Sequence, residues 1–325
     1  MTVLSNIKYT VIIPVKEIND YVIQNIKKIK NENRDDVEII VLPNKINLLL
    51  RDAIIFETGK ISPGEKRDLG AAHAKGEWLL FLDDDSYPNE GYFLALDRIV
   101  ATVNLSAYGG PGITPRDNNF WQHVSGSVFL SRWTGGFPER YLSIGEPKIV
   151  EDWPSVNLIV NTNAFMSVGG FNTKYWPGED SILCEKLNKH TFLIQYRPDL
   201  VVWHHRRQGL KSHIKQVGNY GLHRGFFFKK KIGASYKLKY ICPSLIVIYL
   251  LLSMVFMTFL KEWNEFLIGW FLYLIIIIKG VIEIKKIEGF RIAISSIPYV
   301  FITHFIYGLM FMVGLCKSKI ISELR

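Results

Sequence analysis

The C-terminal third of the chain contains long runs without a charged side chain, and these runs limit the possible fold more than any other feature. Residues Ile241–Leu260 are twenty consecutive uncharged residues. A helix of this length, at about 1.5 Å per residue, matches the roughly 30 Å hydrocarbon core of a bilayer. Two further runs follow: Phe266–Ile278, which Lys279 interrupts, and Ile292–Cys316, which contains a proline and a histidine. We therefore predict a C-terminal membrane region of two or three helices over residues 241–325.

Charge predicts the side of the membrane on which the rest of the chain lies. The net charge is +9, and residues 204–240 hold ten basic residues and no acidic one. Five lysines of this patch directly precede the first apolar run, as expected of a cytoplasmic segment that anionic lipid attracts. These are Lys229, Lys230, Lys231, Lys237 and Lys239. Met1–Tyr9 is too short and mixed for a secretory signal, so we expect residues 1–240 in the cytosol and the helices in the inner (cytoplasmic) membrane.

The basic tail after the last apolar run leaves an alternative open. Three crossings would place Lys317, Lys319 and Arg325 on the far side, against the preference of basic residues for the cytoplasmic side. A last segment that does not fully cross would avoid this conflict.

Two classes of protein are excluded by composition. The positive charge is confined to one patch beside the apolar runs, so nucleic acid is not expected as a partner. The three cysteines lie far apart without a CxxC pair, which fits neither a disulfide framework nor a zinc ribbon.

The first 90 residues alternate between strand patterns and helical patterns. Thr10–Val15 and Val37–Leu42 are short β-branched runs, separated by a polar stretch whose apolar residues have helical spacing. A third apolar run, Trp78–Leu82, follows a helix-like segment and ends at three consecutive aspartates, residues 83–85. This order predicts an α/β fold in which the strands are parallel.

The three aspartates are candidates for a metal site. Ligands of open α/β sheets bind beyond the carboxyl ends of the strands, where these acids are expected. Alternate residues of an extended segment project to the same side, so Asp83 and Asp85 can converge on one divalent cation, while Asp84 points away. A plain turn is the alternative, because the segment is rich in turn-forming residues. Residue type alone does not decide between the two.

Three sequence blocks together resemble family 2 glycosyltransferases of the GT-A fold, of the membrane-anchored bacterial type. The first is PGEKRDLGAAHAKGEWLLFLDDDSYP, from Pro63 to Pro88. The second is NLIVNTNAFMSVGGFNTKYWPGEDSILCEKL, from Asn157 to Leu187, and the third is VVWHH, from Val201 to His205. The blocks follow the order of the family, and such an ordered set is far more specific than any single motif.

The resemblance implies a domain organisation. Residues 1–240 would form a cytosolic GT-A (Rossmann-like) catalytic domain, with a donor half over about 1–115 and an acceptor half over about 116–225. Residues 241–325 would form the membrane region. Processive members of the family carry a Gln-x-x-Arg-Trp motif, where this chain has Arg206, Arg207, Gln208 and Gly209. The resemblance therefore implies the addition of a single sugar.

The resemblance also implies a donor and metal site. The late strand of such enzymes supplies a histidine that completes the metal shell, here His204 rather than the adjacent His205. The metal ligands would be Asp83, Asp85 and His204, holding Mn²⁺ or Mg²⁺. The expected donor-binding residues are Pro14, Asn44, Lys66, Arg67, Asp83 and Asp84. A surface salt bridge is the alternative for Arg67. Many relatives have an aspartate at the end of the second strand, where this chain has Pro43 and Asn44, so the resemblance does not imply specificity for uridine.

Asp180 is the candidate catalytic base. An acceptor hydroxyl loses a proton as it attacks, and a positioned carboxylate is the ordinary group that takes it. Asp180 follows Gly178 and precedes a helical pattern, so an acid that stabilises a helix start is the structural alternative. The resemblance favours the base, with Asn157, Trp176 and Glu179 as acceptor-binding residues.

These expectations describe an inverting, metal-dependent, non-processive glycosyltransferase. The donor would be a nucleotide-diphosphate sugar. The acceptor would be a membrane-associated glycan, most simply one linked to polyprenyl diphosphate in cell-surface polysaccharide synthesis. One alternative is a polyprenyl-phosphate glycosyltransferase. An alternative of another class is a membrane scaffold that binds a nucleotide sugar without turnover, although such a scaffold has no need of a base.

Overall fold

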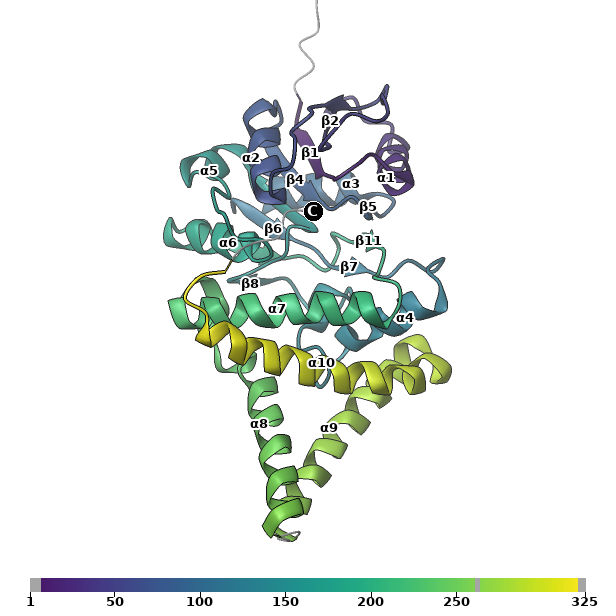
Figure 1. The fold of residues 1–325 in the computed structure, drawn as a ribbon. Helices are drawn as coiled ribbons and strands as arrows, with labels where there is room; N and C mark the ends of the chain where they lie inside the picture. The colour runs from purple at the N-terminus through teal and green to yellow at the C-terminus, as the bar shows by residue number, and fades with distance from the viewer. Residues whose placement is uncertain (1–6, 261–263, 321–325) are drawn as a thin grey trace, which may run out of the picture. The chain divides into compact units, whose positions relative to one another are not determined.

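The computed structural model describes residues 7–260 and 264–320 (Figure 1). The chain forms two compact units. The first, which we call the sheet unit, contains residues up to 113 and residues 142–204. The second, the helix unit, contains residues 114–141 and 205–320. The division into domains at residue 240 that the sequence suggests stays a prediction.

The sheet unit contains an eight-stranded mixed sheet. Its strands in spatial order are β3 (Ile54–Ile55), β2 (Val37–Leu42), β1 (Tyr9–Pro14), β4 (Trp78–Leu82), β9 (Asn157–Asn161), β6 (Ala107–Gly109), β10 (Ile194–Tyr196) and β8 (Lys148–Val150). The strands from β3 to β4 are parallel, whereas β9 runs antiparallel to both of its neighbours. The three strands expected near the N-terminus are therefore present, with boundaries shifted by at most one residue.

Helices cover both faces of this sheet, so its central strands are apolar throughout. One face packs against α1 (Asp20–Lys30) and α3 (Tyr92–Thr102). The other packs against α2 (Pro63–His73), α5 (Thr162–Ser167) and α6 (Glu179–Lys189). Along β1, side chains alternate between the two cores. Burial on both faces explains why β4 reads as a continuous apolar run that stops where the chain leaves the sheet.

A second, three-stranded sheet continues from the end of β4. It consists of β5 (Ser86–Pro88), β11 (Val202–His204) and β7 (Gly112–Ile113). Strand β11 is antiparallel to β5 and parallel to β7. The aspartates at residues 83–85 therefore form the turn between two sheets.

The helix unit contains the C-terminal helices. Its α-helices are α4 (Phe120–Ser127), α7 (Leu210–Lys230), α8 (Cys242–Val255), α9 (Asn264–Glu288) and α10 (Phe290–Cys316). Its short 3-10 helices are η1 (Val128–Leu130), η2 (Pro138–Arg140), η3 (Gly233–Tyr236) and η4 (Leu238–Tyr240), and η5 (Phe256–Leu260) is a short π-helix. Three segments are long and apolar enough to cross a membrane: Cys242–Phe259, Phe266–Glu288 and Phe290–Cys316. The second continues through Lys279, the residue that interrupts the uncharged run in the sequence.

Asn157 shows how a polar side chain holds the sheet unit together. It is the first residue of β9 and is fully buried. Its Nδ2 donates to Leu200 O at 2.7 Å, and its Oδ1 accepts from the Tyr92 hydroxyl at 2.7 Å. The amide thus joins β9 to α3 and to the segment before β11.

Replacing Asn157 by alanine should lower the free energy of unfolding. The carbonyl of Leu200 and the hydroxyl of Tyr92 would lose their buried partner, which costs about 1–3 kcal/mol. The measurement is denaturant unfolding in detergent, followed by tryptophan fluorescence. Asn163→Ala is the control, because Asn163 is exposed on α5 and should leave the midpoint unchanged. Equal midpoints for both variants would contradict this assignment.

Candidate active site

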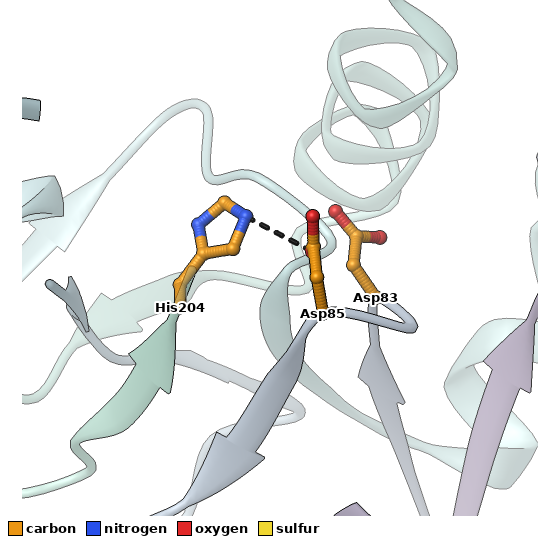
Figure 2. Close-up of side chains that lie close together, drawn as sticks. All are labelled: Asp83, Asp85 and His204. Atoms are coloured by element: carbon orange, nitrogen blue, oxygen red, sulfur yellow. Dashed lines mark ion pairs between the residues drawn. The ribbon is translucent and has the colours of Figure 1, made fainter. Parts of the chain in front are cut away.

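The sheet unit brings two aspartates and a histidine together at the end of β4. One ligand atom from each of Asp83, Asp85 and His204 lies within 4.8 Å of the other two. His204 Nε2 is 3.2 Å from Asp85 Oδ1. Figure 2 shows the three side chains converging from the end of β4, the start of β5 and the end of β11. The turn that we considered as the alternative to a metal site is present, and the same turn carries the two clustered carboxylates.

Strand pairing explains how His204 reaches the aspartates from a distant part of the sequence. In the β5–β11 pair His204 lies opposite Ser86, the residue after Asp85. The turn itself is closed by Ser86, whose backbone N–H and hydroxyl both donate to Asp83 O, at 3.2 and 3.0 Å. His205 instead hydrogen-bonds Asn118 Oδ1 within the helix unit. Of the two histidines, His204 therefore supplies the imidazole of the cluster.

The chemistry of this cluster fits a divalent metal ion. Two carboxylates this close repel each other unless a cation compensates, and oxygen ligands suit both Mg²⁺ and Mn²⁺. The added imidazole favours Mn²⁺. Asp85 is buried, whereas about a third of the Asp83 side chain is exposed, so the group is open on one side.

Arg67 is a buried cation beside the cluster. Its side chain is 3% exposed. One guanidinium nitrogen donates to Asp83 Oδ1 at 2.7 Å and another to Glu179 Oε1 at 3.0 Å. Burial opposes the charge of Arg67, but Asp83, Glu179 and Asp180 outweigh it and raise the pKa of the guanidinium. The surface salt bridge considered for Arg67 is therefore wrong: both ion pairs are formed by a buried guanidinium.

Local structure fixes the helix that carries Arg67. Ser62 caps α2 by accepting from the Glu65 N–H, and the Glu65 carboxylate accepts from the Ser62 N–H, which is a capping box. Pro63 at the first helical position supports the same start. These interactions set where α2 begins, one turn before Arg67.

Glu179 and Asp180 form the first turn of α6. The preceding Gly178 has φ +117°, a conformation that favours glycine. Burial raises the pKa of both carboxyl groups, and Arg67 opposes the shift in each. Asp180 Oδ1 is buried and accepts no hydrogen bond from the described residues. The helix dipole also favours acids here, so the structural role considered for Asp180 is compatible with its position.

Two further polar residues near Asp180 were missed in the sequence. Asp152 is buried, accepts from the Ser181 hydroxyl at 3.1 Å, and its charge contributes to the raised pKa of Asp180. Ser155 donates a hydrogen bond to Asp180, which lowers that pKa. Both residues lie between β8 and β9 in a segment without periodicity or a motif, so no sequence signal identified them.

Most of the other expected donor residues gather at the carboxyl ends of β1 and β2. Lys66 Nζ donates to Val15 O at 2.5 Å, to Leu42 O at 3.1 Å and to Asn44 Oδ1 at 2.6 Å. Burial lowers the pKa of Lys66 to about 8. Pro14 is the last residue of β1 and pairs with Leu42.

Asp84 lies apart from the cluster of Asp83, Asp85 and His204, which we call the metal-ligand group for its proposed role, as the alternation of side chains predicts. Its Oδ2 accepts from Asn19 Nδ2 at 3.2 Å. Its charge also acts on Lys66. Asp84 is thus placed with the β1–β2 residues instead of with the metal ligands.

The three expected acceptor-binding residues differ in their burial and in their contacts. Glu179 is buried against Arg67, and Trp176 is half-buried in the loop before α6. Asn157 is fully buried within the fold. Its placement gives no support to contact with an acceptor, because its amide joins parts of the sheet unit.

Comparison with known proteins identifies the family. Residues 78–313 match the family described as glycosyl transferase family group 2. Over 167 residues the chain is 26% identical to the pre-mycofactocin glycosyltransferase of Mycobacterium tuberculosis, from strains CDC 1551 / Oshkosh and ATCC 25618 / H37Rv. That match covers 49% of the chain and 33% of the relative, so the chain spans about a third of the length of the curated relatives it matches.

A solved structure shares the fold. The chain is similar to the mannosyltransferase PcManGT from Pyrobaculum calidifontis, solved in complex with GDP-Man and Mn²⁺. The TM-score is 0.54 at 15% identity, and the similarity covers 96% of this chain and 88% of that one. The predicted GT-A fold with C-terminal apolar helices is thereby confirmed. Because the family match extends over most of its length, the chain belongs to glycosyl transferase family group 2.

Proposed function

We propose that this protein is a glycosyltransferase that moves one sugar from a nucleotide-diphosphate sugar to an acceptor hydroxyl, with a divalent metal ion and with inversion at the anomeric carbon. The observation that carries the proposal is the arrangement within the sheet unit. The Asp83, Asp85 and His204 cluster, the buried Arg67 and the buried carboxylate oxygen of Asp180 are linked through direct contacts and charges.

The donor diphosphate would bind at the metal-ligand group. Asp83, Asp85 and His204 would hold Mn²⁺ or Mg²⁺, which supplies positive charge to the diphosphate as it leaves. The similar mannosyltransferase in complex with GDP-Man and Mn²⁺ supports this assignment. Lys66, Asn44 and Pro14 would border the nucleotide, since they lie at the carboxyl ends of neighbouring parallel strands.

Arg67 would hold the carboxylates of the site in position. Its two ion pairs hold Asp83 and Glu179 in place, so Asp83 can present its carboxylate to the metal ion. The same positive charge would limit repulsion between the carboxylates and the incoming diphosphate.

Asp180 would accept the proton of the acceptor hydroxyl. As the acceptor oxygen bonds to the anomeric carbon, the bond from that carbon to the diphosphate oxygen breaks and the hydroxyl proton passes to Asp180. A single displacement of this kind inverts the anomeric centre. Burial disfavours the charged carboxylate and so makes it a better proton acceptor. Ser155 would keep the carboxyl group oriented through its hydrogen bond, and the charge of Asp152 would favour the protonated form.

The apolar helices support a membrane-associated acceptor. A catalytic unit attached to the inner membrane on its cytosolic side would be held close to a glycan linked to polyprenyl diphosphate, which is the acceptor we favour. Direct transfer to polyprenyl phosphate is the second candidate, supported by the same helices. The curated relative is named as a pre-mycofactocin glycosyltransferase.

Loss of one metal ligand should weaken metal-dependent donor binding. Asp85→Asn removes a charged ligand, and we expect Mn²⁺ affinity to fall at least about tenfold. The measurement is the free Mn²⁺ signal in electron paramagnetic resonance, together with binding of a panel of nucleotide sugars. Asp35→Asn, an exposed acid before β2, is the control and should bind as the unmodified protein does. Unchanged Mn²⁺ binding by Asp85→Asn would exclude this site.

Removing the proposed base should separate binding from turnover. Asp180→Asn should bind Mn²⁺ and donor normally but lower kcat by about 10²–10⁴-fold, because amide nitrogen and oxygen do not take the proton. Released nucleotide and transferred sugar give the rate. Glu185→Gln on the same helix, whose carboxylate pairs with Lys189, should keep its activity. Normal turnover by Asp180→Asn would remove the base assignment. Donor binding without any turnover by the unmodified protein would instead favour the scaffold alternative.

Removing the buried charge of Arg67 should lower the free energy of unfolding far more than breaking an exposed ion pair does. Arg67→Met leaves Glu179 buried without its partner and should lower the free energy of unfolding by about 3–5 kcal/mol. Arg197→Met, which breaks the exposed pair with Asp199, should cost less than about 1 kcal/mol. Denaturant unfolding in detergent compares the two. Adding Glu179→Gln to Arg67→Met should recover part of the lost free energy of unfolding. Strictly additive effects of the two substitutions would show that the two residues are not coupled.

A further inference from the structure

Helix α10 lies side by side with helices that are too polar or too short to cross a membrane. Within the helix unit its N-terminal half packs against α4, where the Trp121 and Tyr299 rings are stacked 6.4 Å apart. Its C-terminal half runs along α7, where His213 Nε2 hydrogen-bonds Thr303 Oγ1 at 2.7 Å. Figure 1 shows α7 and α10 running next to each other, while α8 and α9 leave them and meet at their far ends. Each half of α10 is therefore packed against α4 or α7, in addition to its contacts with α8 and α9.

Glycines bring the backbones of α7 and α10 into contact. A Cβ at Gly221 would lie 2.5 Å from Tyr307 O, and one at Gly225 would lie 2.0 Å from Phe311 O. From the other helix, a Cβ at Gly314 would lie 2.2 Å from Leu222 O. These distances leave no space for lipid between the two helices, so they must occupy the same depth.

Polar contacts tie both ends of α10 to the same two helices. At the junction of α9 and α10, His123 Nδ1 of α4 lies 2.9 Å from Glu288 Oε2. After the last turn of α10, Lys229 Nζ at the end of α7 donates to Lys317 O at 3.4 Å. Whichever side of the membrane holds α4 and α7 therefore holds both ends of α10.

Helix α7 cannot be in the hydrocarbon core. It carries five basic side chains in 21 residues. These are Lys211, Lys215, Arg224, Lys229 and Lys230. Each basic residue at the centre of a spanning helix costs about 2.5–3.5 kcal/mol even on insertion scales, which give the lowest estimates. Helix α4 has eight residues, about 12 Å, which is less than half of the hydrocarbon thickness.

We propose that α10 does not cross the membrane but lies along its surface beside α7. Helices α8 and α9 would enter the membrane from the leaflet at that surface, as a hairpin, and return to it. The partner of the outward face of α10 is the lipid of that leaflet. This inference does not depend on the reaction proposed above, because it uses only the packing of the helix unit.

The outward face of α10 has the character of an interfacial helix. Phe290, Ile294, Ile297 and Phe301 are exposed and recur at the spacing of a single helix face. Basic residues flank the helix at both ends, where they would meet anionic headgroups. These are Lys285, Lys286, Arg291, Lys317 and Lys319. The arrangement also removes the conflict with the positive-inside preference, because the C-terminal lysines stay on the side of α7.

Single-cysteine labelling tests the side on which α10 ends. In a Cys242→Ser, Cys316→Ser background, the buried Cys184 stays unreactive until denaturation. Lys229→Cys then reports the side of α7, and Lys319→Cys reports the end of α10. A membrane-impermeant maleimide is applied to sealed vesicles of both orientations, with a permeant maleimide for the total. We expect both cysteines to react in the same vesicle orientation. Reaction in opposite orientations would overturn the proposal.

A depth measurement tests whether α10 lies flat. A fluorophore is attached in turn at Ile294→Cys, Phe301→Cys and Leu309→Cys of the full chain in vesicles that contain anionic lipid. Lipids with a quencher near the headgroup should quench all three more strongly than lipids with a quencher near the chain end. Lys30→Cys on α1 is the water-exposed control. A crossing helix would instead place Phe301 deepest, and stronger quenching there by the chain-end quencher would overturn the proposal.

Discussion

The sheet unit depends on one buried positive charge that serves several carboxylates. The Arg67 guanidinium reaches Asp83 at the end of β4 and Glu179 at the start of α6, and its charge acts on Asp180 as well. Taking so many charges out of water is costly, and a buried ion pair of this kind is poor evidence for added stability. Its effect is to fix the relative positions of a strand end and a helix start. A divalent ion would provide the positive charge that one arginine cannot.

The proposed chemistry follows from how these elements end. Strand β4 stops where its apolar run stops, which places the first aspartate beyond the sheet. Helix α6 begins at a glycine that no other residue replaces easily, which places two acids in its first turn. Helix α2 begins at a capping box, which sets the position of Arg67 one turn later. Each functional side chain thus lies within a few residues of a boundary between secondary-structure elements.

Much of this arrangement could be predicted from the sequence, and the reasons differ between residues. The strands, the aspartates and the α/β fold follow from local patterns, and the class of enzyme follows from the order of three motifs. The partners of Arg67, the contribution of Asp152 and the internal role of Asn157 depend on contacts between distant segments, which no local pattern encodes. The apolar character of α10 identified a segment that is long and apolar enough to cross a membrane, but its pairing with α7 depends on glycines that no sequence pattern distinguishes.

The pairing of β5 with β11 has a consequence for how the metal-ligand group assembles. Side chains of a strand alternate between faces, so a slip of one residue would bring the indole of Trp203 or the ring of His205 opposite Ser86 and turn the imidazole of His204 away. Every proposed ligand would still be present in the chain, yet a divalent cation at this site would lose one of its three ligands. The proposed metal site therefore depends as much on strand alignment across more than a hundred residues of sequence as on the ligand residues themselves.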